Sequence, residues 1–167
     1  MKQLSLFLLV CVFFCVSCSK TSYSSRKRTS TKSSVAKKKP SKSTSPVLVR
    51  FDRSGSMSNA MDKAKSSGKY IFLDFYTDYC PPCKVMDKEV FGNRELANYL
   101  NDNFINVKVN AGKTDGANLA SMFNVRAYPT LIFADQQGNA LMRKEGGTTI
   151  STVRYMAEEV LRATAMK

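Results

Sequence analysis

Two cysteines with a short, fixed spacing are the residues best able to do chemistry. Cys80 and Cys83 are separated by two prolines. At the start of a helix, this spacing lets the two sulfur atoms meet within disulfide distance. Cys80 would lie at or just before the helix N-terminus, where free N–H groups and the helix dipole stabilise a thiolate. Prolines suit the first helical turn, which needs no intrahelical N–H donors. We therefore expect Cys80 to be the attacking thiolate and Cys83 the resolving thiol.

A metal site is the alternative interpretation of a lone Cys-x-x-Cys pair. Structural zinc takes four ligands, usually Cys or His. The chain has no His, and its three other cysteines, Cys11, Cys15 and Cys18, all lie near the N-terminus. This argues against a zinc or haem site within one chain. A copper(I) site formed by Cys80, Cys83 and Met86 stays open. Our expectation is no metal and no cofactor beyond a redox-active Cys80–Cys83 disulfide.

The first residues have the pattern of an export signal. Lys2 precedes a largely apolar stretch of thirteen residues, from Leu4 to Val16, whereas a membrane-spanning helix needs about 20. The end of this stretch, Val16-Ser17-Cys18, resembles the lipobox of bacterial lipoproteins, although Cys15 stands where that family usually has Leu. The resemblance implies a signal peptide over residues 1–17 and lipidation of Cys18. The alternative is ordinary signal cleavage with Cys18 as an incidental small residue.

The segment over residues 18–46 differs sharply in composition from the rest of the chain. The net charge of the chain is +13, but ten of its 26 basic residues lie in residues 1–49, which hold no Asp or Glu. Ser, Thr, Lys and Arg dominate this segment, so it cannot bury enough apolar surface to fold. We expect a disordered tether before a nearly charge-balanced domain over residues 47–167. A basic nucleic-acid-binding face is therefore not expected.

Within this domain, strands and helices alternate and are followed by a hairpin, which indicates an α/β fold. The expected strands are Tyr70–Tyr76, Phe104–Val109, Leu131–Ala134 and Ala140–Lys144. The expected helices are Ser58–Ser67, Lys84–Leu100 with a bend near Gly92, Asn118–Phe123, and a last helix capped by Thr148 or Thr149 and ending near Thr164.

Three landmarks in the correct order resemble the thioredoxin family. Residues 72–84 (FLDFYTDYCPPCK) look like its active-site strand, turn and helix, and Tyr128-Pro129-Thr130 looks like its cis-proline loop. Gly146-Gly147 stands where the family has a glycine before the last helix. Residues 84–91 (KVMDKEVF) further resemble the thioredoxin-like domain of DsbD-type transmembrane reductases and related exported lipoproteins. The resemblance implies a thioredoxin fold with a central mixed sheet flanked by helices.

The resemblance also assigns roles around the dithiol. Asp74 lies where thioredoxins carry a buried Asp, which implies that it takes the proton of Cys83. A solvated or backbone-bonded strand Asp is the alternative. Lys108 matches a family lysine that can pair with this carboxylate, and is a candidate proton-relay partner, although a strand Lys is usually solvated.

The same resemblance places substrate-binding residues near the dithiol. It implies a cis peptide bond at Pro129, with the backbone of Tyr128 beside Cys80 to pair with an extended substrate, and Thr130 next to it. Tyr79 stands where thioredoxin has a tryptophan and would line the contact surface. Tyr76 also matches a tryptophan and is either a contact or a core residue.

These observations favour an exported, membrane-tethered enzyme that reduces protein disulfides. Its expected partners are proteins with disulfides, a membrane thiol donor such as a DsbD-like reductase, and the membrane through a lipid anchor, in the bacterial cell envelope facing the periplasm or exterior. The chain departs from thioredoxin in having Pro-Pro between its cysteines, and no His lies there, as it does in strong oxidants. A disulfide donor or isomerase, and a non-catalytic binding or chaperone module, are the alternatives.

Overall fold

The computed structural model describes residues 48–165, which form a mixed five-stranded sheet. The strand order is β1-β3-β2-β4-β5. The β1 and β2 strands run parallel to β3, whereas β4 is antiparallel to both β2 and β5. This arrangement places β2, the strand that leads into the dithiol, between two partners. The strands are β1 Phe51–Asp52, β2 Tyr70–Tyr76, β3 Phe104–Asn110, β4 Thr130–Ala134 and β5 Ala140–Glu145.

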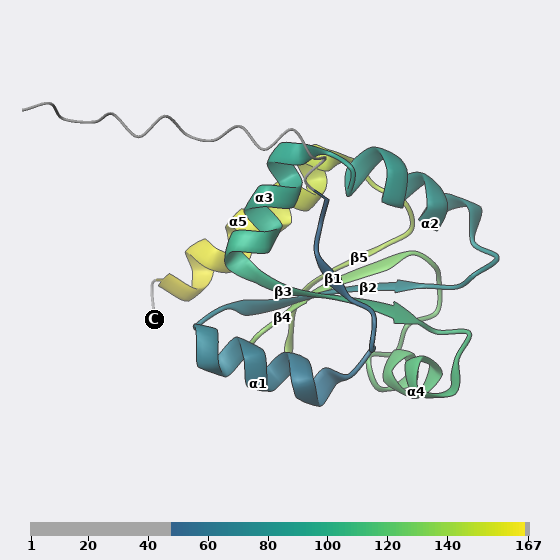
Figure 1. Ribbon diagram of the computed structural model, residues 1–167, viewed down its shortest axis with the longest axis horizontal. Helices are drawn as coiled ribbons and strands as arrows, with labels where there is room; N and C mark the ends of the chain where they lie inside the picture. Colours follow the sequence, from purple (N-terminus) through teal and green to yellow (C-terminus); the bar gives the residue numbers. More distant parts are fainter. Residues whose placement is uncertain (1–47, 166–167) are drawn as a thin grey trace, which may run out of the picture. The chain divides into compact units, whose positions relative to one another are not determined.

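Helices cover both faces of the sheet, with α1 and α4 on one face and α2, α3 and α5 on the other (Figure 1). The chain alternates strands and helices up to the β4–β5 hairpin, which agrees with the expected thioredoxin fold. The helices are α1 Met57–Ser67, α2 Pro81–Val85, the π-helical turn η1 Met86–Val90, α3 Arg94–Asn103, α4 Thr114–Met122 and α5 Ile150–Ala165.

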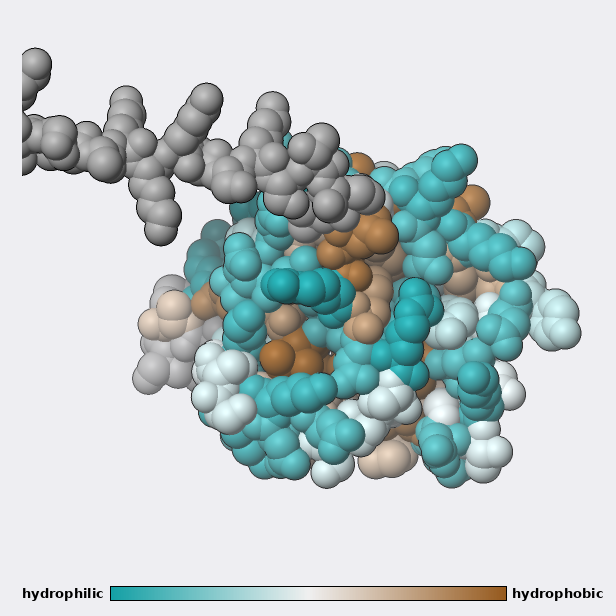
Figure 2. Space-filling model, viewed as in Figure 1, coloured by the Kyte–Doolittle hydropathy of each residue, from teal (hydrophilic) through white to brown (hydrophobic). Residues whose placement is uncertain are grey.

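Alternating side chains of β2 divide the core into two parts. Ile71, Leu73 and Phe75 pack with α1 and α4, whereas Phe72 packs with η1, α3 and α5. Asp74 shares the face of Phe72 because side chains in a strand alternate with a period of two. The outer surface seen in Figure 2 is largely hydrophilic, as expected when both helix layers bury their apolar sides. The strand therefore presents one carboxylate toward the layer that contains α2.

One long helix with a bend near Gly92 was expected over Lys84–Leu100. The predicted position of the bend is confirmed, but the single helix is wrong, because the chain breaks there. The chain forms α2, passes through the π-helical turn, and breaks at Phe91-Gly92-Asn93 before α3 begins at Arg94. A Cβ at Gly92 would lie 2.3 Å from the carbonyl oxygen of Lys88, so a side chain does not fit at this break. Asn93 then caps α3 by accepting the N–H of Leu96 at 3.0 Å. The break leaves a short first helix that ends just beyond the dithiol.

Other boundaries agree more closely with the sequence. Strand β2 has the predicted bounds, and the hairpin agrees to within one residue. Thr149, one of the two predicted caps, accepts the N–H of Thr152 at 3.3 Å. The helix expected from Asn118 begins instead at Thr114. Gly116 is a poor helix former, but it lies in the first turn because a Cβ there would clash with the Asn110 carbonyl.

The expected signal peptide over residues 1–17, the expected lipidation site Cys18, the expected tether up to residue 46, and Val47 lie outside the described residues. Within residues 48–165, no helix combines the length and the apolar character needed to cross a membrane.

Candidate functional site

The dithiol loop joins the end of β2 to the start of α2. The Cys80 N–H donates to the carbonyl of Thr77 at 3.3 Å, which closes the turn after the strand. Cys80 is the N-cap residue of α2, and Pro81 and Pro82 occupy the first helical positions. The predicted placement of both cysteines at a helix N-terminus is therefore confirmed. Proline is tolerated here because the first N–H groups of a helix have no intrahelical acceptor.

Cys80 and Cys83 form a disulfide, with their Cα atoms 5.3 Å apart. The Cys83 N–H donates to the Cys80 Sγ at 3.2 Å. On reduction, the same N–H would face a thiolate on Cys80, and a hydrogen bond to a charged acceptor is stronger than one to a neutral acceptor. Cys83 lies inside the helix and is 3% exposed, against 7% for Cys80. Both residues are buried, so it is the N-cap position of Cys80 that favours it as the sulfur that meets a substrate.

The carboxylate of Asp74 is buried on the sheet face that packs against the helix layer containing α2. Its Oδ2 accepts a hydrogen bond from the Lys108 ammonium at 2.7 Å, so the interpretation of Asp74 as solvated or backbone-bonded is wrong. Desolvation raises the pKa of Asp74 above its usual value and outweighs the opposing attraction of Lys108. Oδ1 has no hydrogen-bond partner among the described residues. Asp74 is thus a buried carboxylate with one oxygen free to take a proton.

Lys108 is buried between two carboxylates, although a strand lysine is usually solvated. It lies opposite Asp74 in the β2–β3 register, and its ammonium also bonds Asp87 on η1. The ammonium further lies 4.9 to 5.5 Å from the ring centroids of three aromatic side chains, which favour a nearby cation. These rings belong to Phe51, Tyr76 and Phe91. Tyr76 is half-buried, and its ring contacts the core pair.

Sequence reasoning missed Asp87. Its side chain is 44% exposed, so it connects the buried Asp74–Lys108 pair to solvent. Asp87 follows Cys83 by four residues, a spacing that would place the two on one face of a regular helix. That spacing was the available signal, but the π-helical turn sets the final direction of the side chain.

The loop before β4 has the predicted cis bond between Tyr128 and Pro129. The Pro129 carbonyl accepts the Gly146 N–H at 2.8 Å, and the Thr130 hydroxyl donates to the Ala127 carbonyl at 2.7 Å. The Thr130 side chain is fully buried, so it shapes the loop rather than presenting its hydroxyl at the surface. Tyr128 is half-buried and packs against the core on the α1 and α4 side.

The surface next to the dithiol is both exposed and grooved. Tyr79 is 94% exposed immediately before Cys80. A groove of about 400 Å³ lies between the helix that carries the dithiol and the loop before α5. Its lining is Pro82, Val85, Met86, Glu89, Val90, Gly147, Thr148 and Thr149.

Met86, the third sulfur residue of the copper(I) alternative, makes a contact within the fold. The Met86 side chain is buried, and its Sδ accepts the Thr148 N–H at 3.3 Å. Among residues 48–165, no group of three or more His, Cys, Asp or Glu side chains is arranged to hold a metal ion. The hydrogen bond between Met86 and Thr148 links the turn after α2 to the loop before α5.

Comparison with known proteins identifies the domain. A family model described as a thioredoxin-like domain matches residues 57–161. The thiol:disulfide interchange protein DsbD of Yersinia pestis is 38% identical over 82 residues, which make up 47% of this chain and 13% of the DsbD sequence. The chain thus spans only about an eighth of that relative's length.

Solved structures show the same fold. A thioredoxin from Thermus thermophilus has a TM-score of 0.60 and 20% identity, over 68% of this chain and 88% of that one. The C-terminal domain of Neisseria meningitidis DsbD in its oxidised form has a TM-score of 0.54 and 21% identity, over 65% and 97% of the two chains.

The Asp74→Asn variant tests the buried carboxylate through the pH dependence of stability. Because burial raises the pKa of folded Asp74 above 3.8, its stabilising contribution is fully present below about pH 4 and is lost as the pH rises through the folded pKa. Asparagine does not ionise. The free energy of unfolding of the variant should therefore increase relative to wild type between about pH 4 and pH 8, as measured by urea titration.

The exposed Asp62→Asn substitution in α1 is the matched control, and its difference from wild type should stay flat. An Asp74→Asn difference that is constant, or that decreases with pH, would contradict the assignment.

Proposed function

The chain belongs to the thioredoxin-like family and is a thiol–disulfide oxidoreductase, and we propose that it is a membrane-tethered reductase of protein disulfides. The observation that supports the dithiol chemistry most directly is the disulfide at the N-terminus of α2, where the Cys83 N–H faces the Cys80 sulfur. A thiolate formed on Cys80 has a hydrogen-bond donor already in place. The exposed Tyr79 and the neighbouring groove give a protein substrate a surface to contact.

The reduction proceeds by two thiol–disulfide exchanges. The Cys80 thiolate attacks one sulfur of the substrate disulfide and forms a mixed disulfide, and the other substrate sulfur leaves as a thiolate that takes a proton. Cys83 then gives its proton to Asp74 and attacks the Cys80 sulfur, which releases the second substrate thiolate. Two electrons pass from the dithiol to the substrate, and Cys80–Cys83 becomes the disulfide. Asp74 passes the proton on to that second thiolate.

Asp74 suits the role of proton acceptor because its environment favours a proton. Desolvation raises its pKa, so this carboxylate takes up a proton more readily than a solvated one. Lys108 orients one oxygen, and the other has no partner within the described domain. The chain has no His, and this buried carboxylate lies on the sheet face that α2 covers.

The surroundings of the dithiol support the proposed reducing direction. Strong oxidants hold their reduced form unusually stable. Here no His lies between the cysteines to stabilise a thiolate, and Asp74 and Asp87 place two carboxylates on the side of the sheet that packs against η1. The reduced pair is therefore a ready donor of electrons. A membrane thiol donor of the DsbD type would restore it by exchange.

The proposed place of action is the bacterial cell envelope. The lipobox-like Val16-Ser17-Cys18 supports cleavage after residue 17 and acylation of Cys18, which would be followed by the basic tether of residues 18–46. A flexible chain of this length has a typical reach of about 30 Å. The domain could then contact both a membrane donor and nearby substrates.

The Cys18→Ser variant tests the anchor. In a bacterial host, the wild-type chain should fractionate with the membrane, and the variant should keep its signal segment uncleaved at residue 17 and lack acyl chains. Mass spectrometry of the N-terminal peptide detects both changes. A wild-type chain found without acyl groups would exclude lipidation.

Cysteine variants test the chemistry. Cys83→Ser should trap Cys80 in a mixed disulfide with a protein substrate that carries a disulfide, because the resolving thiol is missing. Cys80→Ser should trap nothing. Asp74→Asn in the wild-type dithiol should slow resolution by about 100-fold at pH 7, the lower range for loss of an acid–base group. Non-reducing electrophoresis and quenched-flow alkylation measure the two effects. Trapping through Cys83 in the Cys80→Ser chain would reverse the assigned roles.

A further inference from the structure

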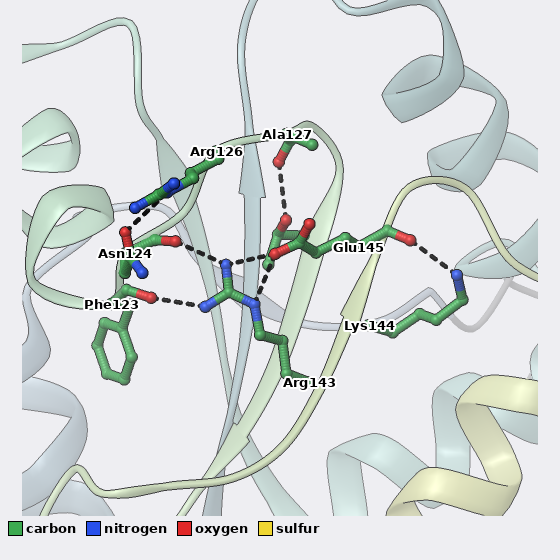
Figure 3. Close-up of polar contacts among 8 residues, drawn as sticks. Phe123, Asn124, Arg126, Ala127, Arg143, Lys144 and Glu145 are labelled. Carbon is green, nitrogen blue, oxygen red and sulfur yellow. Dashed lines mark hydrogen bonds and ion pairs between the residues drawn. The ribbon is translucent and has the colours of Figure 1, made fainter.

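A network of polar contacts centred on Arg143 of β5 lies outside the dithiol site. Its Nη1 donates to the carbonyl of Phe123 at 2.6 Å, and its Nη2 donates to the carbonyl of Asn124 at 2.8 Å. The same guanidinium contacts the Glu145 carboxylate, with Nε at 2.9 Å and Nη2 at 2.7 Å. Figure 3 shows the guanidinium lying between these three acceptors, which come from two separate segments.

The first segment is the end of α4. Helix α4 finishes at Met122, and Asn124 has a positive φ of 52°, which turns the chain out of the helix. The last carbonyls of a helix have no intrahelical donor, and Arg143 supplies donors to two carbonyls just beyond that end. Four residues separate Asn124 from Pro129, so this contact fixes the start of the loop that carries the cis bond.

The second segment lies on the other side of the same loop. Glu145 follows Arg143 by two residues on β5, so both side chains lie on one face of the strand. The next residue, Gly146, donates its N–H to the Pro129 carbonyl at 2.8 Å. Arg143 and Glu145 thus connect the chain before Pro129, at the end of α4, to the end of β5. The residue after β5, Gly146, is hydrogen-bonded to Pro129 itself.

The planar fork of the side chain is what this position requires. Arginine presents several N–H groups in a rigid fork, whereas lysine offers a flexible ammonium. Three donor nitrogens here meet two carbonyls and a carboxylate that point from different directions (Figure 3). Arg143 is partly exposed, and nothing in these contacts touches Cys80, Cys83 or Asp74.

We propose that Arg143 is a positioning residue that holds the cis-proline loop in the conformation that docks protein substrates. This inference rests on the proposed reductase function. Under that function, a protein disulfide docks against the loop backbone before exchange, whereas a small disulfide needs only to reach the Cys80 sulfur. Arg143 should therefore govern the KM for protein disulfides and leave the chemistry of the dithiol unchanged.

The test compares Arg143→Ala and Arg143→Lys with wild type in the full chain. Insulin serves as the protein disulfide, with dithiothreitol as the electron source. Dithiobis-nitrobenzoate serves as the small disulfide and is mixed with the pre-reduced chain after dithiothreitol has been removed, because dithiothreitol reduces this reagent directly. Arg154→Ala is the matched control, because Arg154 also pairs with a carboxylate, Glu158, on the surface. Arg143→Ala should raise the KM for insulin about tenfold, equivalent to about 1.4 kcal/mol, with kcat within about twofold of wild type.

Three further readouts complete the expectation. Arg143→Lys should recover only part of the lost affinity, and Arg154→Ala should match wild type. The rate with the small disulfide and the reduction potential of the Cys80–Cys83 pair should not change. If Arg143→Ala does not fold, the Arg143→Lys chain gives the KM comparison by itself.

Other outcomes would overturn the proposal in distinguishable ways. An insulin KM equal to that of wild type, or an equal loss with both disulfides, would remove the positioning role while leaving the reductase function intact. A wild-type chain that turns over neither disulfide would overturn the proposed function itself, and the role of Arg143 with it.

Discussion

The buried ammonium of Lys108, held between Asp74 and Asp87, is the interaction on which the rest of the site depends. A charge in a protein interior is tolerated only when it is paired and hydrogen-bonded. Removing one partner from such a buried pair commonly costs about 3–5 kcal/mol. Strand β2 supplies Asp74, strand β3 supplies Lys108 and η1 supplies Asp87. These three side chains together hold the central sheet against the layer that carries the dithiol.

This arrangement links fold to chemistry through a few local features. The parallel β2–β3 register sets Asp74 opposite Lys108, and the π-helical turn after α2 brings Asp87 onto the same ammonium. Single π-helical turns within helices are rare and are frequent at functional sites. The turn also ends the short helix whose N-terminus holds the two cysteines, so Asp74, the redox pair and Asp87 come from one continuous segment, to which β3 adds Lys108.

Much of this architecture could be predicted from the sequence, for physical reasons that vary between elements. Strand β2 has its predicted bounds because a run of β-branched and aromatic residues is a strong signal. Gly92 indicated where the helix after the dithiol would bend, but not that it would break, because the close approach of Gly92 to the Lys88 carbonyl is a property of the folded chain. Asp87 and Arg143 escaped notice because their partners lie far away in the sequence, on β3 and at the end of α4. Local periodicity carries no information about such contacts.

The reduction potential of the Cys80–Cys83 pair tests the central claim most directly. The full chain would be equilibrated in glutathione buffers, and alkylation followed by mass spectrometry of the peptide containing both cysteines would give the reduced fraction. The account predicts a potential near that of thioredoxin, about −270 mV. A potential near that of a strong oxidant, about −120 mV, would contradict it and make the chain a disulfide donor.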